Sequence, residues 1–406
     1  MKKALLMLGV LSVLVTWSFC SQTIAATPTA QWEKTFGGTG EDYFLTVSPT
    51  DDGGFILTGV TDSYGAGSKD VYLVKTDSSG NEQWPEPKTF GGTGYNVGYT
   101  AQQTTDGGYI VGGYFNTETE ACLIKTSSDG TSEWQNIYTM GSGIDTCFSV
   151  QQTTDGGYIF TGMTNSGAGD KDIPLVKTDA SGNQLWSTTF GGTNKEHGTW
   201  VRQTKDGGYI IAGDSRSFGE TGSDVYLVKT DSDGDSLWEK TFDISLDDQA
   251  YCVQELDDGY IITGISDYLT GSDDIFLLKT DSAGNKIWEQ SFGGSSTEHG
   301  RSVLQTLDGG FIIAGYTNSY GAGDYDGYLI KTDSSGIMEW DKTFGGELRD
   351  AFFSVQQISG SEYIAAGLLT SVYGGGNSDA YLVSVVPEPA TLLLLGLGSL
   401  VLRRRK

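Results

Sequence analysis

The sequence predicts an all-β protein, a seven-bladed β-propeller of four-stranded antiparallel blades. First, a tryptophan opens a similar phrase seven times at spacings of 50 or 52 residues: Trp32, Trp84, Trp134, Trp186, Trp238, Trp288 and Trp340. Second, 59 glycines, only 7 prolines and 12% aromatic residues favour short strands joined by tight turns. Third, the repeats carry no helical stripe, so a period of this length indicates propeller blades rather than a helical solenoid.

Each period contains four segments with strand character. The first alternates, as in residues 149–153, and the second is continuously apolar, as in residues 209–211, which is typical of a strand buried on both faces. Residues 226–230 and 238–242 exemplify the third and fourth segments. Between the first two segments, pairs such as Asp106–Gly107 and Asp206–Gly207 supply the positive φ of a tight hairpin. Each period is therefore a four-stranded meander that must pack against its neighbours.

The repeats are offset from the ends of the chain. In the last repeat, the third strand near residues 381–385 is not followed by a strand that carries the tryptophan. Residues 32–36, by contrast, form a tryptophan strand that comes before the first complete set of four strands. We therefore expect residues 32–36 to be the outermost strand of the blade that also contains residues 353–357, 363–367 and 381–385. This pairing would close the ring with both ends of the chain.

The formal net charge is -27, and cations cluster at both ends of the chain. An acidic surface repels nucleic acid and anionic lipid headgroups, so we expect no nucleic-acid partner and membrane contact only through the C-terminal segment. The charge suits either a solvated acidic coat or cation binding.

Residues 1–26 have the three parts of a secretory signal peptide, and we expect a signal helix there. Lys2 and Lys3 form the cationic start, a short apolar run follows, and Ala25 and Ala26 are small residues suited to cleavage. Near the other end, residues 390–402 are mostly apolar, and as a helix they would reach about 20 Å against about 30 Å of hydrocarbon. Cations after this short hydrophobic helix would stay in the cytoplasm and leave the upstream chain outside the membrane.

Residues 386–406 combine a short motif, a marginal apolar segment and a basic end. Pro387, Glu388 and Pro389 precede the apolar segment, and the chain ends with the cations Arg403, Arg404, Arg405 and Lys406. This arrangement resembles the PEP-CTERM sorting signal of Gram-negative proteins handled by exosortase; an ordinary C-terminal anchor is the alternative. The resemblance implies transient anchoring in the inner membrane, cleavage near Pro387–Pro389 by an exosortase-type protease, and release towards the cell surface or extracellular polysaccharide.

The body, residues 31–385, resembles bacterial and archaeal surface proteins that carry seven-bladed propeller repeats. The resemblance is to a class of repeats, so it implies the fold and a surface location but no ligand.

Acidic residues recur where the chain enters the innermost strand of each blade. They are predicted to form an acidic rim at the central opening: Asp42, Asp145, Glu196, Asp248, Glu298 and Asp350. A second set recurs between the second and third strands: Asp70, Asp172, Asp224, Asp274, Asp326 and Asp379. The rim would bind cations or cationic partners; alternatively, these side chains cap turns by accepting backbone N–H bonds.

The two histidines occupy one repeat position, next to glutamates, as Glu196–His197 and Glu298–His299. Near a channel mouth these four residues are weak candidates for acid–base catalysis or metal binding, because the other blades carry unrelated residues there.

Asp231, Asp233 and Asp235 alternate like the start of a calcium loop, but the later glycine and carboxylate of such a loop are missing. Calcium is therefore the one cofactor considered, and no other is expected. Cys122, Cys147 and Cys252 are an odd set after removal of the signal, so buried free thiols are expected.

These observations favour an exported, non-enzymatic propeller that binds a polysaccharide or surface protein, or has a structural role, at the cell surface or in the extracellular matrix. Phosphate-loop, nucleophile-elbow and metal-spaced Cys/His motifs are missing from the sequence, although propeller enzymes need no local motif. The alternatives are a carbohydrate-active enzyme with its site in the central funnel and a calcium-stabilised adhesion module.

Overall fold

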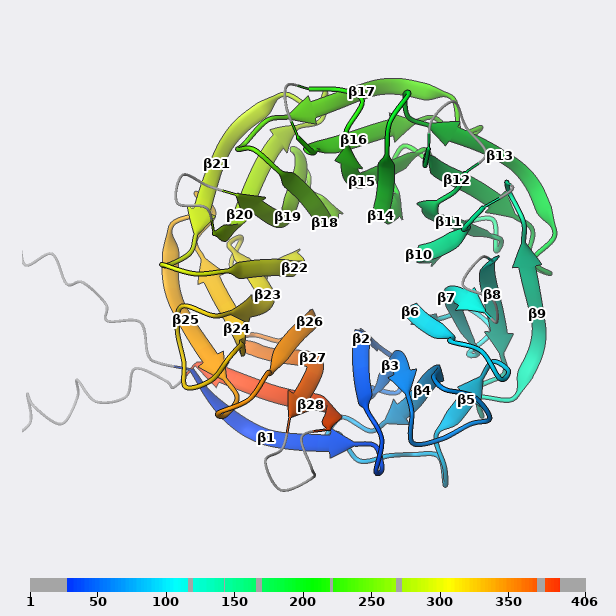
Figure 1. Ribbon diagram of the computed structural model, residues 1–406, viewed down its shortest axis with the longest axis vertical. Helices are drawn as coiled ribbons and strands as arrows, with labels where there is room; N and C mark the ends of the chain where they lie inside the picture. Colours follow the sequence, from blue (N-terminus) through cyan, green and yellow to red (C-terminus); the bar gives the residue numbers. More distant parts are fainter. Residues whose placement is uncertain are drawn as a thin grey trace, which may run out of the picture.

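The computed structural model describes residues 28–387, apart from 116–119, 142, 166–169, 220–221, 268–271 and 371–376. Seven four-stranded antiparallel sheets form a ring, with one strand of each sheet facing the central axis (Figure 1). The fold class predicted from the repeats is confirmed. The expected signal helix and C-terminal hydrophobic helix lie outside the described residues, and within them no helix is long and apolar enough to cross a membrane.

Six blades are consecutive sets of four strands, ordered from the axis outward. Their strands are β2 (Asp42–Pro49), β3 (Phe55–Thr61), β4 (Asp70–Thr76) and β5 (Lys88–Phe90) in blade 1; β6 (Val97–Gln103), β7 (Tyr109–Phe115), β8 (Glu120–Thr126) and β9 (Ser132–Tyr138) in blade 2; β10 (Thr146–Gln152), β11 (Tyr158–Met163), β12 (Ile173–Thr178) and β13 (Gln184–Phe190) in blade 3; β14 (Glu196–Gln203), β15 (Tyr209–Ser215), β16 (Asp224–Thr230) and β17 (Ser236–Phe242) in blade 4; β18 (Asp248–Glu255), β19 (Gly259–Asp267), β20 (Asp273–Asp281) and β21 (Lys286–Phe292) in blade 5; β22 (Glu298–Gln305), β23 (Phe311–Thr317), β24 (Asp326–Thr332) and β25 (Met338–Phe344) in blade 6.

Blade 7 joins the two ends of the described chain. Its strands are β26 (Ala351–Ser359), β27 (Glu362–Thr370), β28 (Ser378–Pro387) and, outermost, β1 (Pro28–Phe36). β1 pairs antiparallel with β28 from Phe36 opposite Ala380 to Pro28 opposite Pro387 (Figure 1). The predicted closure by the first tryptophan strand is therefore confirmed.

The core lies between blades rather than within any one of them. The middle strands are buried on both faces, as β3 and β4 of blade 1 illustrate, because each blade is covered by two neighbours. One cluster joins Val225 and Leu227 of blade 4 to Ile262 and Phe276 of blade 5. No blade can bury both of its faces alone, so each one depends on the closed ring.

The recurring tryptophan connects each outer strand to the following blade. Trp238 of β17 meets the ring of Tyr260 at 5.9 Å, and Trp186 of β13 meets Tyr209 at 6.0 Å. Trp238 also lies against the positive-φ Gly284 of the β20–β21 hairpin, where a Cβ would be only 2.9 Å from the indole. The fixed tryptophan period therefore reflects one contact between neighbouring blades, repeated around the ring.

A buried lysine explains the Asp-Gly-Gly turns more fully than the turn geometry alone. In blade 4, the ammonium of Lys229 donates to the carbonyl of Thr230 at 2.9 Å and forms a 2.9 Å ion pair with Asp206. Gly207 has φ of 88°, as the hairpin requires, while a Cβ at Gly208 would lie 2.8 Å from the Lys229 ammonium. That Cβ would lie still closer, at 2.1 Å, to the Thr230 carbonyl oxygen, so the second glycine allows the close approach of β16 together with its lysine. The expected free thiols, Cys122, Cys147 and Cys252, are buried and unpaired.

Candidate functional site

One residue of each innermost strand lies in a β-bulge, at the same place in all seven blades. The bulges are marked by register shifts against the second strand, and the bulged residues are Leu45, Tyr99, Phe148, Thr199, Tyr251, Arg301 and Phe353. A bulge re-aims a side chain out of the strict alternation of a strand. All seven of these residues line one central cavity of about 440 Å³. We call them the bulge ring.

The backbone of the bulge ring has the same bulge in every blade, but the seven side chains differ. The cavity is therefore chemically asymmetric. Tyr99, Phe148, Tyr251 and Phe353 present aromatic rings, and Tyr43 and Trp200 add two more to the wall. Burial raises the pKa of the Tyr43 and Tyr99 phenols, so both stay protonated at neutral pH. The wall therefore offers neutral aromatic faces.

Arg301 is the charged member of the bulge ring, and aromatic rings hold its guanidinium in place. Its Cζ lies 4.1 Å from the ring centroid of Tyr251 and 6.0 Å from that of Phe353, within cation–π range. One Nη donates to the hydroxyl of Tyr316 at 3.0 Å. The buried Nε has no hydrogen-bond partner among the described residues.

A second guanidinium, that of Arg349, also lines the cavity, and its side chain is exposed. The lining carboxylate of Glu41 is neutralised by Lys69 at 2.6 Å. The cavity of this acidic protein is therefore locally cationic, which favours an anionic ligand.

Trp200 separates the central cavity from a second one. It lines both the 440 Å³ cavity and another of about 140 Å³, where Arg202 stacks on the indole at 4.7 Å. The buried indole N–H of Trp200 has no partner among the described residues.

The structure does not bring the four Glu and His candidates together at the cavity. Adjacent residues of a strand point to opposite faces, and Glu196 is buried while His197 lies 3.2 Å from Asp214. The carboxylate of Glu196 accepts hydrogen bonds from Ser215 and from the backbone N–H groups of Gly192 and Ser217.

Glu298 repeats the arrangement of Glu196, and His299 is packed behind the cavity wall. Its Nδ1 accepts from the Tyr316 hydroxyl at 2.7 Å, and its Nε2 lies 3.1 Å from Asp273. Burial, with the nearby charges of Arg301 and Arg349, lowers the pKa of His299 to about 3.

The acidic rim residues cap turns and do not face solvent. Asp42, Asp145, Glu196, Asp248, Glu298 and Asp350 are each at most 1% exposed. Each carboxylate accepts a backbone N–H from the residue four places earlier: Gly38, Gly141, Gly192, Ile244, Gly294 and Gly346. Of the two interpretations drawn from the sequence, these contacts support turn capping over a solvent-facing acidic rim, because the turn before each innermost strand needs an acceptor for its N–H groups. At Asp248, burial and the nearby Asp224 and Asp243 raise the pKa to about 6.

The loop with Asp231, Asp233 and Asp235, which the sequence suggested for calcium, has the hydrogen bonds of an ordinary hairpin turn. Asp231 accepts the backbone N–H groups of Asp233 and Asp235 at 3.0 and 2.9 Å, as Asp179 does with Ser181 and Asn183 in the preceding blade. Calcium binding at this loop remains a prediction.

Sequence reasoning missed the bulge ring and Trp200. Each ring member stands three places after an acidic or amide residue that starts or directly precedes the innermost strand, and Trp200 is the one tryptophan of the body outside the 50–52 residue series. The departure of Trp200 from the series was the available signal, because a residue that breaks a structural repeat does not serve the contact which the repeat maintains.

Comparisons with known proteins identify the C-terminal signal and the fold. Residues 385–406 match the PEP-CTERM protein-sorting motif. This motif indicates export and membrane-associated sorting to the cell surface, and signals of this kind are processed by exosortase, a membrane protease. No curated protein matches the chain in sequence.

Several solved structures are similar to this chain in fold. The Pan2 WD40 domain of Neurospora crassa has a TM-score of 0.55 at 7% identity, covering 90% of this chain and 97% of its own. A protein of unknown function from Dyadobacter fermentans has a TM-score of 0.50 at 12% identity, with 89% and 99% covered. YCF48 bound to D1 peptide has a TM-score of 0.51 at 11% identity, with 90% and 99% covered. At these identities the likeness shows the fold alone, and the chain is a seven-bladed β-propeller with a PEP-CTERM sorting motif at its C-terminus.

Proposed function

We propose that this protein is a non-enzymatic binding protein of the cell surface or extracellular matrix of a Gram-negative bacterium. The observation that carries the proposal is the bulge ring, which gathers one side chain from every blade around a single cavity of about 440 Å³. A concave site with aromatic walls and a few polar groups is typical of ligand binding. The acid–base candidates Glu196 and Glu298 are committed to turn capping, which argues against the funnel enzyme considered from the sequence.

The chemistry of the cavity suits an acidic polysaccharide. Aromatic faces such as Tyr99 and Phe148 pack against the apolar faces of sugar rings, and a guanidinium binds a carboxylate in a fork geometry. Arg301 and Arg349 supply two such groups in a chain whose net charge is -27. We infer that the ligand carries uronic-acid residues.

Export and sorting place this site outside the cell. Residues 1–26 would direct the chain across the inner membrane, and the C-terminal motif would hold it there until an exosortase-type protease releases it. In cells that lack this protease, the intact chain should accumulate in membranes. Mature extracellular protein that still carries residues 390–406 would contradict this route.

Binding to immobilised oligosaccharides tests the ligand assignment directly. The exported protein should bind uronic-acid oligosaccharides and not their neutral counterparts, and Arg301→Gln and Tyr99→Ala should each weaken binding roughly tenfold or more. Leu185→Ala, on the exposed outer strand β13, is the matched control and should bind like the wild type.

Acidic peptides are the second class of anionic ligand to include in the same experiment, since YCF48, which has a similar fold, was solved bound to a peptide, the D1 peptide. If the protein preferred a peptide, the proposed ligand of this cavity would change from an acidic glycan to an anionic peptide. Binding that is unaffected by both cavity variants would exclude the cavity as the binding site.

A further inference from the structure

The junction between blades 4 and 5 departs from the repeat at Asp243. The residue in this place is Gly37 before blade 1, Gly191 before blade 4 and Gly345 before blade 7. These glycines sit directly against carboxylates: a Cβ at Gly191 would overlap both Asp172 and Glu196, and one at Gly345 would lie 2.8 Å from Asp326 Oδ1. A side chain in this position must therefore enter the space between two acids.

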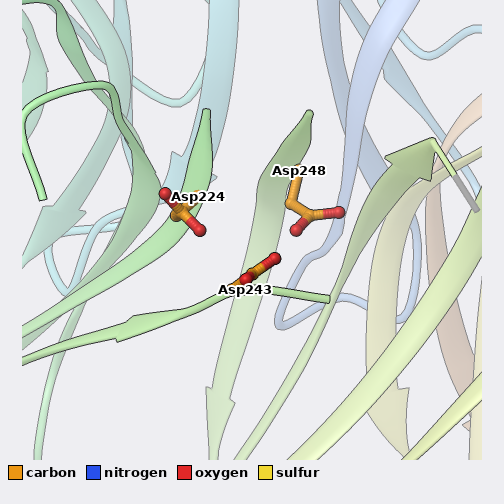
Figure 2. Close-up of side chains that lie close together, drawn as sticks. All are labelled: Asp224, Asp243 and Asp248. Carbon is orange, nitrogen blue, oxygen red and sulfur yellow. The ribbon is translucent and has the colours of Figure 1, made fainter. Parts of the chain in front are cut away.

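Asp243 thus adds a third carboxylate to a pair that the neighbouring junctions already contain. Asp224 begins β16, Asp243 follows the end of β17, and Asp248 begins β18. One carboxylate oxygen from each of the three lies within 4.8 Å of the others, and Figure 2 shows the three side chains gathered around one point. Asp224 and Asp248 are buried, whereas Asp243 is exposed and keeps the cluster open to solvent. Within the described residues this is the one such group of potential metal ligands.

The Asp248 carboxylate has bonding capacity that the protein leaves unused. Its Oδ2 accepts the backbone N–H groups of Ile244 and Ser245 at 2.8 and 2.9 Å, but the buried Oδ1 has no partner among the described residues. The side chain is 0% exposed, so bulk water does not compensate this oxygen. A fully buried carboxylate that faces two further carboxylates points to a cationic ligand.

At other junctions between blades, fewer carboxylates lie together or an amide takes the place of one acid. Asn96 replaces the acid before β6 and donates to Asp70 Oδ1 at 3.2 Å, which relieves the repulsion there. Asp42 and Asp145 also leave an oxygen without a described partner, but the residues in the place of Asp243 are Gly37 and Thr139, which bring no further carboxylate. Of the described ion pairs, none supplies a lysine or arginine to Asp243 or Asp248; the nearby Arg216 pairs with Asp247 at 3.4 Å.

We propose that Asp224, Asp243 and Asp248 bind one Ca²⁺ ion that bridges blades 4 and 5. Calcium takes oxygen ligands at about 2.3–2.6 Å, so oxygens no more than 4.8 Å apart reach one ion with at most a small inward shift. Its flexible coordination tolerates a site built from three separate backbone segments, with water and further oxygens completing the shell. The ion would hold the last two strands of blade 4 against the first strand of blade 5. At an affinity typical of extracellular modules, the site would fill only after export.

Calcium titration of the chelator-stripped mature protein tests the proposal. By isothermal titration calorimetry we expect one site per chain with a Kd of about 0.1–1 mM, and a melting temperature that rises with added Ca²⁺. Asp243→Gly restores the residue that other junctions carry and should fold normally, yet lose at least about tenfold in affinity and most of the thermal shift. Asp243→Asn removes the charge at constant shape and should act in the same direction.

The matched control is the triple variant Asp231→Asn, Asp233→Asn, Asp235→Asn, which removes the acids of the β16–β17 hairpin. It should bind Ca²⁺ like the wild type. The proposal is overturned if the wild type binds no Ca²⁺ up to about 10 mM, or if both Asp243 variants keep wild-type affinity. It is also overturned if the triple variant alone abolishes binding, because the ion would then lie at the hairpin.

Discussion

The rings of Phe36 and Phe44 meet edge to face with their centroids 5.4 Å apart, although Phe36 belongs to blade 7 and Phe44 to blade 1. Both side chains are buried in a cluster that also contains Leu57 of blade 1 and Leu382 of blade 7. Two residues near each other in sequence thus lie on opposite sides of the seam that closes the ring. Strand pairing and side-chain packing therefore close the ring together.

Phe36→Ala should destabilise the protein by about 3–5 kcal/mol, because it removes a ring that is only 5% exposed at this seam. The free energy of unfolding in urea measures the effect. Ile137→Ala, on the outer strand β9 with 51% of its side chain exposed, should change it by less than about 0.5 kcal/mol. Equal effects of the two substitutions would show that the seam is not a critical contact.

Gly234→Ala and Gly53→Ala separate backbone strain from the tryptophan contact. Both glycines have positive φ, at 88° and 80°, but a Cβ at Gly234 would lie 2.7 Å from the Trp186 ring whereas one at Gly53 meets nothing within 4 Å. Gly53→Ala should cost about 1–2 kcal/mol from φ alone. Gly234→Ala should cost a further 1–3 kcal/mol or so from steric overlap, measured by thermal unfolding of both variants.

Lys229→Met should destabilise blade 4 although the aliphatic stem is preserved. The buried ammonium has a side chain only 4% exposed, and it serves both the Thr230 carbonyl and Asp206. Its loss removes the donor to the buried Thr230 carbonyl and the cation paired with the exposed Asp206, at a cost of about 1–3 kcal/mol. Lys205→Met is the control, because the Lys205–Asp257 pair is exposed to solvent and should contribute little.

His299 should make stability depend on pH in a defined direction. Its pKa is about 3 in the folded protein, because of burial and the charges of Arg301 and Arg349, and about 6.5 when unfolded. Below pH 6.5 the unfolded chain takes up the proton first, so stability falls as the pH is lowered towards 3. Between pH 7 and 5 the wild type should lose about 2 kcal/mol more than His299→Gln. If the free energy of unfolding in urea changed with pH by the same amount in both proteins across this range, this protonation scheme would be contradicted.

The repeat period and strand patterning were sufficient to predict the architecture. Apolar second and third strands, the position of the tryptophans and the unmatched first strand each translate directly into burial, blade contacts and ring closure. The buried lysines could not be foreseen in the same way. Lys229 looks like a surface residue in the sequence, and its burial beside Gly208 depends on how the two strands of the blade approach each other.

The candidate site was less predictable because it depends on bulges and side-chain direction. Glu196 and His197 looked like partners in the sequence, but the alternation of the strand separates them. Arg301 gave no motif, and only the register shift in β22 turns it towards the cavity. Asp243 and Asp248 looked unrelated in the sequence until the turn between β17 and β18 placed their carboxylates together.

The pairing of Pro28 with Pro387 has a consequence for maturation. Pro387 is the last residue of β28 and lies within the sorting motif at residues 385–406, so no spacer separates the folded body from the predicted place of cleavage. A protease needs extended, accessible substrate, and here the neighbouring peptide bonds are paired with strand β1. Release from the membrane would then require this edge to fray for a moment. The rate of cleavage would then depend on the stability of the pairing between β1 and β28.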